Sequence, residues 1–222
     1  MKSVCLLSRK PGTTREAFRE YYENRHAPLG SRYFPFAKYV RNHLLASDEP
    51  VDFDVITEFF FDDSTDVAGV HSGRVREILD ADERAFMNQR LIRPAAAEEL
   101  ILVGPAREVT PAGRRRQILL LQRQGDDTAF RSAIAGWAQA LAENHGLSRI
   151  SVDYTTPHYQ EGEQRFPWAA MLSLWLDDAS EAITRLEPPP GVGLSADLLA
   201  EVCESSPETL ANLYTPDAAL RD

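Results

Sequence analysis

The sequence predicts an α+β protein that is built from two tandem copies of one small unit. One observation is the order of strand and helix patterns, which recurs in both halves, and another is the alternation of polar and apolar residues along the strands. The third is an internal echo, in which Leu6-Leu7-Ser8-Arg9, Gly12 and Ala17-Phe18-Arg19 return as Leu120-Leu121-Gln122-Arg123, Gly125 and Ala129-Phe130-Arg131. A repeat this long is not a solenoid and indicates two domains, which we place at 1–110 and 111–222.

The first half reads as strand, helix, two strands, helix and strand. Thr13 or Thr14 caps the first helix. We expect this helix to end near His26, because Pro28 disfavours a helical conformation in the residue before it. The order βαββαβ is that of a ferredoxin-like unit. The predicted strands are 2–9, 36–46, 51–61 and 100–103, and helical segments cover 13–26 and 64–90.

The second half repeats this order less clearly. The echo predicts a strand at 116–124 and a helix at 128–145. The remaining elements are strands at 148–157 and 167–176, helical segments near 178–186 and 195–204, and a last strand at about 208–214. The basic run Arg114-Arg115-Arg116 lies at the junction of the halves, and we interpret it as a solvated linker.

A single unit of this type covers only one face of its sheet with helices, so the other face needs a partner. We expect the two units to pack sheet to sheet as an α+β barrel within the chain. Placing the more apolar side of each strand against the helices leaves polar residues on the open face. These residues are Tyr39, Arg41, His43, Asp54 and Glu58. They line a walled pocket if the second unit covers them, and otherwise they face water.

Composition excludes several classes of function. A net charge of −10 argues against binding to nucleic acid or to an anionic membrane. No apolar run is long enough to cross a membrane, and the two cysteines, Cys5 and Cys203, have no metal-type spacing. We therefore expect a cytoplasmic protein with buried thiols. No metal-ligand cluster and no Gly-rich phosphate loop occurs in the sequence, so we expect neither a metal nor a cofactor.

Five stretches of the first half carry a family resemblance. They are Leu6–Gly12, Phe18–Leu29, Tyr39–His43, Phe53–Asp63 and Asp82–Phe86. Together they resemble the EthD-domain family of the dimeric α+β barrel superfamily, over about residues 2–105. The second half resembles the family only through the echo, as a degenerate copy.

The resemblance has implications for assembly and activity. Relatives are often homodimers whose sheets pair across the interface; here the second unit would replace the partner, and a further homodimer stays open. Characterised relatives include cofactor-free dehydratases of polyketide pathways, lactone isomerases of aromatic catabolism and accessory proteins of ether degradation. Isomerases of methylmuconolactones carry Cys directly after the strand Glu, where this chain has Phe59. A thiol-dependent isomerisation is therefore not expected. The matched positions are His26, Tyr39, Asn42, Asp54 and Glu58.

These matched positions suggest catalytic and substrate-binding groups, together with Arg41 and His43, which share the strand parity of Tyr39. His26 or His43 would act as general acid or base, because imidazole titrates near neutral pH. Glu58 would orient a His or accept a proton, and Tyr39 and Arg41 would hold an oxyanion. Asn42 and Asp54 complete the substrate-binding set, although Asp54 could instead only form a salt bridge with Arg41. The alternative interpretation is that His26 caps a helix and that His43 lies on an exposed strand face.

The sequence therefore predicts a cofactor-independent lyase or isomerase that moves protons on a small aromatic or polyketide-like molecule. One alternative is a non-catalytic protein that binds such a molecule in the same pocket. Another is a haem enzyme with His145 or His158 as axial ligand. The simplest interpretation of His145 is a helix end before Gly146, and His71 is expected on an exposed helix face.

Overall fold

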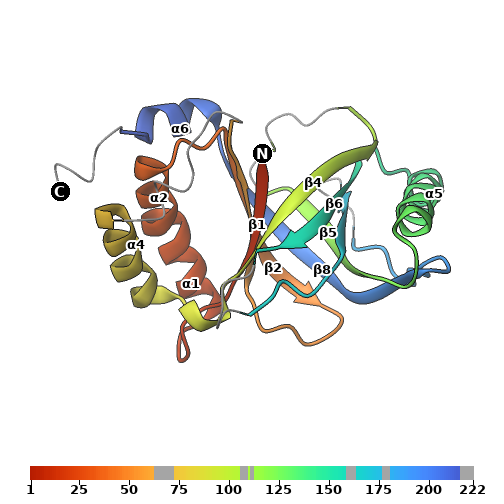
Figure 1. The fold of residues 1–222 in the computed structure, drawn as a ribbon, viewed down its shortest axis with the longest axis horizontal. Coiled ribbons are helices and arrows are strands. Elements are labelled where there is room, and N and C mark those ends of the chain that lie inside the picture. Colours follow the sequence, from red (N-terminus) through yellow and green to blue (C-terminus); the bar gives the residue numbers. More distant parts are fainter. Residues whose placement is uncertain (63–72, 106–109, 111–112, 159–163, 177–180, 216–222) are drawn as a thin grey trace.

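Eight antiparallel strands close into a barrel in the computed structural model, which describes residues 1–62, 73–105, 110, 113–158, 164–176 and 181–215 (Figure 1). The strands are β1 (Lys2–Leu7), β2 (Lys38–Ser47), β3 (Val55–Phe60), β4 (Arg93–Val103), β5 (Arg115–Arg123), β6 (Ile150–Pro157), β7 (Ala170–Trp175) and β8 (Val192–Ser205). Their order around the barrel is β1-β3-β2-β8-β5-β7-β6-β4. The expected α+β barrel within one chain is confirmed.

Each half of the chain contributes four neighbouring strands to the barrel. The strands of the first half lie in the order β4-β1-β3-β2, and those of the second half in the order β8-β5-β7-β6. When the four strands of each half are numbered along the chain, both halves have the order fourth, first, third, second. Two pairings join the halves, β2 with β8 and β4 with β6. In these pairings His43 lies opposite Glu201, and Tyr154 lies opposite Glu98. The sheets therefore meet edge to edge, and their open faces enclose the interior.

Helices cover the barrel on two sides (Figure 1). Thr14 Oγ1 accepts a hydrogen bond from the Ala17 N–H and so begins α1, and Gly146, with φ +65°, ends α5. Both caps agree with the sequence patterns. One side carries α1 (Arg15–Tyr21), the π-helix η1 (Tyr22–His26), α2 (Ala27–Tyr33), α4 (Gly73–Phe86) and α6 (Pro207–Leu213), with the 3₁₀ turn η2 (Gln89–Leu91) below them, and the other side carries α5 (Asp127–His145).

Three expectations for the second half are wrong. Residues 195–204 lie in strand β8 and not in a helix, and α6 takes the place of the last predicted strand. The described part of 178–186, residues 181–186, forms no helix. The second half thus departs from βαββαβ, because pairing of β8 with both β2 and β5 overrides the helical propensity of its Ala, Leu and Glu residues.

The interior of the barrel is packed with side chains. Most of them are aliphatic and fully buried, because an eight-stranded barrel is just wide enough for side chains to fill it. They include Val4, Leu6, Leu44, Ile56, Ala95, Ile118, Leu120, Ala196, Leu198 and Ala200. A set of charged groups, here called the interior ion cluster, completes the filling: the buried Lys2, Glu58, Arg116 and Asp153, and the partly exposed Glu99. The walled pocket expected inside the barrel is therefore wrong.

Candidate functional site

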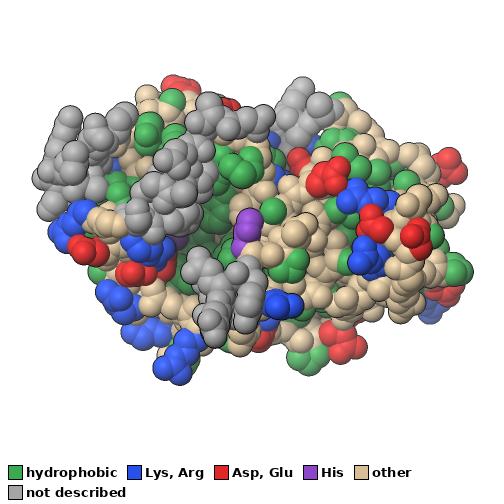
Figure 2. Space-filling view, in the orientation of Figure 1, with side chains coloured by type: hydrophobic (Ala, Val, Ile, Leu, Met, Phe, Trp, Pro, Cys, Tyr) green, Lys and Arg blue, Asp and Glu red, His purple; other side chains and the backbone are tan. Residues whose placement is uncertain are grey.

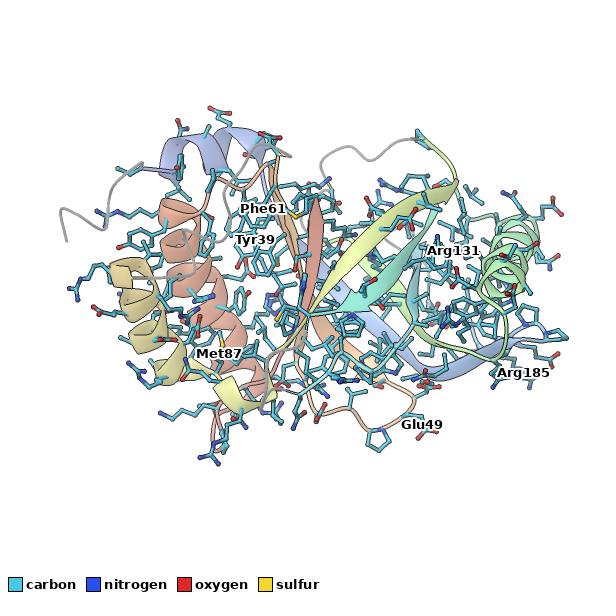
Figure 3. The ribbon with its side chains drawn as sticks, in the orientation of Figure 1. Tyr39, Glu49, Phe61, Met87, Arg131 and Arg185 are labelled. Atoms are coloured by element: carbon cyan, nitrogen blue, oxygen red, sulfur yellow. The ribbon has the colours of Figure 1, made fainter. Side chains whose placement is uncertain are left out.

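The predicted site residues lie on two opposite faces of the sheet. Tyr39 packs in the apolar layer between sheet and helices, and Figure 3 shows it on the helical side of the barrel. Arg41 and His43 share its strand parity and reach residues of η1. Asn42 and Glu58 have the other parity and bond to each other at 2.8 Å inside the barrel. The single polar wall expected from the sequence is therefore wrong, because both faces of this sheet are buried and alternation alone does not tell them apart.

Glu58 belongs to the interior ion cluster and not to a His pair. Its carboxylate lies 2.8 Å from Lys2 Nζ and also accepts a hydrogen bond from Arg116. Lys2 Nζ lies 3.0 Å from Glu99 and 2.5 Å from Asp153. The three carboxylates could hold a cation, and the Lys2 ammonium already takes that place. Arg116 is fully buried within this cluster, so the expectation of a solvated linker there is also wrong.

A π-turn positions the polar groups on the helical side. Within η1, the N–H of Ala27 donates to Tyr22 O, five residues back. Pro28 has no N–H, so the usual bond to the fourth residue back is lost there and the helix accommodates an extra residue. The helix continues to Tyr33, so the predicted end at His26 is wrong. This turn carries Tyr22, Glu23 and His26. We call these three residues and their partners, Tyr39, Arg41, His43, Thr57 and Asp82, the helix-side cluster.

Glu23 pairs with two groups from β2. Glu23 Oε1 lies 2.6 Å from His43 Nε2, and Glu23 Oε2 accepts from Arg41 at 2.6 Å. Burial alone would raise the pKa of Glu23, but the hydrogen bonds from His43 and Arg41 outweigh it and lower the pKa to about 2. The carboxylate is therefore ionised at neutral pH and only accepts. It follows that His43 donates through Nε2, which leaves Nδ1 as the basic nitrogen.

A second His–carboxylate pair lies on the other side of Tyr22. His26 Nδ1 lies 2.7 Å from Asp82 Oδ2 on α4, and Tyr21 donates to the other oxygen of Asp82 at 2.9 Å. The His26 side chain is 11% exposed. An Asp that accepts from Nδ1–H fixes the tautomer and leaves Nε2 as the nitrogen that can accept a proton. The ring of Tyr22 is edge-on to both imidazoles, with centroids 5.0 Å from His26 and 5.7 Å from His43.

Two phenols and a hydroxyl form a hydrogen-bonded group of their own near the two pairs. Tyr22 Oη lies 3.0 Å from both Tyr39 Oη and Thr57 Oγ1. Burial raises the pKa of Tyr22 and of Tyr39 above the usual value, so both phenols stay protonated at neutral pH. Neutral phenols donate hydrogen bonds and can stabilise a developing oxyanion. In Figure 2 hydrophobic side chains gather in a hollow between this helical side and the barrel.

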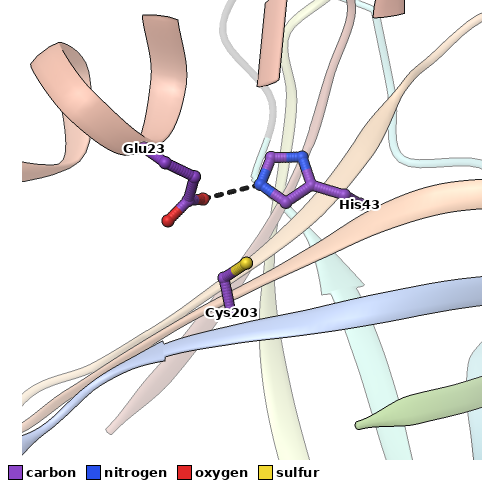
Figure 4. A group of neighbouring side chains, drawn as sticks. All are labelled: Glu23, His43 and Cys203. Atoms are coloured by element: carbon purple, nitrogen blue, oxygen red, sulfur yellow. Dashed lines mark hydrogen bonds and ion pairs between the residues drawn. The ribbon is translucent and has the colours of Figure 1, made fainter. Parts of the chain in front are cut away.

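Cys203 brings a thiol from β8 to the helix-side cluster (Figure 4). Its Sγ, a Glu23 oxygen and a His43 nitrogen lie within 4.8 Å of one another, a set that could ligate a metal ion. Burial, followed by the charge of Glu23, raises the pKa of Cys203, so the thiol is protonated. Arg19 lies 3.8 Å from the sulfur, and Arg41 neutralises Glu23. These two guanidinium groups disfavour a further cation at this position.

Asp54 lies apart from both clusters. Its carboxylate accepts from Arg9 and from Arg15 Nε, the latter at 3.0 Å, at the start of α1. A salt bridge to Arg41 was the expected alternative, and it is wrong, since Arg41 pairs with Glu23. Of the other histidines, His145 and His158 are exposed, and His71 lies outside the described residues.

Sequence reasoning missed the partners of the two imidazoles. Glu23 stands four residues after Arg19 and three before His26, a spacing that places all three on one helix face and could have identified it. Asp82 lies within the stretch that carries the family resemblance, but nothing local assigns it to His26. Cys203 was hidden by the wrong helix prediction for 195–204.

Comparison with known proteins agrees with the fold. Residues 10–90 match the family model of the EthD domain, so the resemblance of the first half is confirmed. No curated protein matches the chain. A solved structure of an anthrone oxidase-like protein superposes with a TM-score of 0.60, covering 93% of this chain and 92% of that one at 13% identity.

Two more distant structures are also similar. One is provisionally assigned as a chlorite dismutase, with a TM-score of 0.45, 12% identity and coverage of 96% of this chain and 98% of that one. The other, from Lactobacillus acidophilus NCFM, is provisionally assigned as a monooxygenase, with a TM-score of 0.42, 9% identity and coverage of 80% and 76%. No helix in the described part of the chain is long and apolar enough to span a membrane.

Proposed function

We propose that this protein is a cofactor-independent lyase or isomerase that moves protons on a small aromatic or polyketide-like molecule. The observation that carries the proposal is the pair of His–carboxylate contacts, His26 with Asp82 and His43 with Glu23, on either side of Tyr22. A carboxylate that accepts from one imidazole nitrogen makes the other nitrogen a better base. Two such pairs could remove a proton at one atom and return it at another.

The reaction would begin at His26, because its side chain is 11% exposed and that of His43 only 4%. His26 Nε2 would take a proton from a carbon beside a carbonyl, and the electron pair of the C–H bond would form an enolate. One of the two neutral phenols, Tyr22 or Tyr39, would donate to its oxygen, while the other donates within the pair. Returning the proton to another carbon gives an isomer. Donating it to a β-hydroxyl group, which leaves as water, gives a dehydrated product.

Aromatic packing around the cluster favours a flat substrate. Tyr39 stacks against both Phe36 and Phe59, with centroids at 4.8 and 5.2 Å. Phe86 lies 5.0 Å from the His26 ring and 5.7 Å from the Tyr22 ring. Rings of this kind pack against planar molecules in offset or edge-on geometry.

We further propose that the chain contains two fused copies of one unit, 1–110 and 111–222. The shared strand order and the echo support this division. Fusion would place both halves of a two-subunit barrel in one chain.

The contacts of Arg41, Asn42, Asp54 and Glu58 change the roles that the sequence predicted for them. Arg41 becomes a positioning residue for Glu23, and Asn42 and Glu58 act inside the barrel. Asp54 orders the start of α1.

Proton abstraction can be tested before a product is known. We would incubate anthrone, a planar ketone with acidic methylene protons, with the protein in deuterated buffer and follow the loss of these protons by NMR. His26→Ala and His43→Ala should each lower the catalysed exchange rate by about 10²-fold or more, the scale of acid–base assistance. His145→Ala, which changes an exposed His at the end of α5, should leave the rate unchanged.

The result also separates the alternatives. Retained exchange in both His26→Ala and His43→Ala would reject the mechanism. Binding without exchange for a panel of planar ketones would favour the non-catalytic binding protein. A haem-type absorption band in the purified protein would favour the haem enzyme.

A further inference from the structure

The second half of the chain carries a cleft of about 690 Å³ beside the start of α5. Figure 3 shows Arg131, one of its lining residues, between α5 and the barrel. Sites for small molecules typically have volumes of roughly 300–1,000 Å³. The residues that matter below are Glu98, Arg123, Asp127, Arg131, Tyr154 and Trp168.

This cleft occupies the position in the second half that the helix-side cluster occupies in the first. Arg131 is the echo of Arg19. Arg19 forms an ion pair with Glu201, which lies opposite His43 across β2 and β8. Likewise Arg131 lies 2.9 Å from Glu98, which is opposite Tyr154 across β4 and β6. The arginine–carboxylate frame is therefore present twice, once on each side of the barrel.

The groups that move protons are present only once. Extending the echo along α5 places Ile134, Ala135 and Ala138 at the positions of Tyr22, Glu23 and His26. Ile134 and Ala138 are fully buried in an apolar core. Tyr154 stands where the first half has His43. The second half therefore keeps the arginine–carboxylate ion pair, which can bind a ligand, and lacks both His–carboxylate pairs.

Charge and ring contacts define the ligand that this cleft would take. Asp127 accepts from Arg123 at 2.7 Å and from Arg131 at 3.0 Å, and Glu98 also accepts from Arg131. The cleft therefore contains two arginines and two carboxylates, and their charges cancel. A charged ligand gains little from a site without net charge. Exposed carboxylates accept hydrogen bonds from hydroxyl groups, and arginines donate to their oxygens.

Flat surfaces lie next to these polar groups. The guanidinium of Arg131 lies 3.9 Å from the centre of the Tyr154 ring, and the Arg131 side chain is 37% exposed. Trp168 is held edge-on by Phe53 and Phe166, with centroids at 5.8 and 5.6 Å. Guanidinium planes and indole rings both stack on aromatic molecules.

We propose that this cleft is a second, non-reactive binding site for a neutral, planar aromatic molecule that carries hydroxyl groups. Its rings would stack on Arg131 and Trp168, and its hydroxyl groups would bond to Glu98 and Asp127. The site is independent of the proposed chemistry, because it contains neither imidazole. It would allow a product or a related metabolite to bind without being turned over.

The test is calorimetric titration of the whole chain with 2,7-dihydroxynaphthalene. Arg131→Lys keeps the charge and loses the flat donor, and it should raise the Kd about fivefold or more. Trp168→Leu should raise it by about tenfold. Arg74→Lys, in an exposed ion pair on α4, is the matched control and should bind like the wild type. Circular dichroism confirms that each variant is folded.

Several results would overturn the proposal. One is that the wild type does not bind 2,7-dihydroxynaphthalene. Another is that Arg131→Lys and Trp168→Leu are both folded and bind it with the affinity of the wild type. Loss of binding in His43→Ala would place the ligand in the helix-side cluster instead. Equal affinity for naphthalene-2,7-disulfonate would refute the preference for a neutral ligand. Normal binding in a protein that catalyses no proton exchange would reject the proposed function and leave this site standing.

Discussion

Replacing Asp153 with Asn should remove a pH dependence of stability that the interior ion cluster imposes on the fold. Asp153 is fully buried, and one of its oxygens has no hydrogen-bond partner in the described structure. In the cluster two cations, Lys2 and Arg116, face three carboxylates, so one negative charge is left uncompensated. Burial raises the pKa of Asp153 to about 6, and the attraction of Lys2 offsets this only in part.

The sign of the effect follows from proton linkage. In the unfolded chain an Asp titrates near pH 3.9. The folded protein holds the Asp153 proton more tightly, so this group stabilises the fold at low pH and loses that contribution as pH rises through about 6. At about 1.4 kcal/mol per pKa unit, the shift of roughly two units corresponds to about 3 kcal/mol in the free energy of unfolding.

The measurement is urea unfolding of both proteins at several values between about pH 4 and about pH 8. Wild-type stability minus Asp153→Asn stability should fall by about 3 kcal/mol across this range. Glu143→Gln, which changes an exposed carboxylate on α5, should give a profile parallel to the wild type. A constant difference between wild type and Asp153→Asn would refute the raised pKa and the charge count behind it.

Four further substitutions test other parts of the structure. Glu23→Gln removes the negative charge that pairs with His43 and Arg41. The proton-exchange rate measured by NMR should therefore fall about 10²-fold. An unchanged rate would contradict the proposed role of Glu23 as the partner of His43. Tyr22→Phe leaves Tyr39 and Thr57 without their shared partner and should lower the free energy of unfolding in urea by about 1–3 kcal/mol. Gly104→Ala should cost about 1–3 kcal/mol in thermal unfolding, because φ is +88° and a Cβ would lie 2.2 Å from Ser148 O. Gly136→Ala, at an exposed position of helix α5, should instead stabilise by about 1 kcal/mol.

Patterns within single elements predicted much of the fold. The echo located β5 and α5, and Thr14 and Gly146 act as the caps that their types suggest. Strand β8 was missed although its sequence carries a period of two. Ala196, Leu198, Ala200 and Val202 are buried inside the barrel, and Asp197, Leu199 and Glu201 alternate with them. High helix propensity concealed this alternation, because the pairing that decides the conformation comes from strands distant in sequence.

The face of the sheet could not be predicted in the same way. The rule that apolar residues face the helices fails here, because the helical layer accepts the ring of Tyr39 and the paired Arg41 and His43. The barrel interior in turn accepts Glu58, because Lys2 and Arg116 neutralise it. Each buried charge is explained by a partner from a distant segment, and such partners are not visible in a local pattern.

The difference between the halves agrees with the absence of a helix between β7 and β8 in the described residues of that segment. His26 is held by Asp82, and Asp82 lies on α4. No helix forms in the described residues 181–191, the segment before β8 in which a counterpart of α4 would lie. A His at position 138 would therefore be buried without a carboxylate from that side, which costs free energy. Ala138 and Ile134 instead pack in the apolar core under α5. In the described residues, helix α4 and the His26 imidazole that it holds thus occur in the same half, and we place the proposed chemistry there.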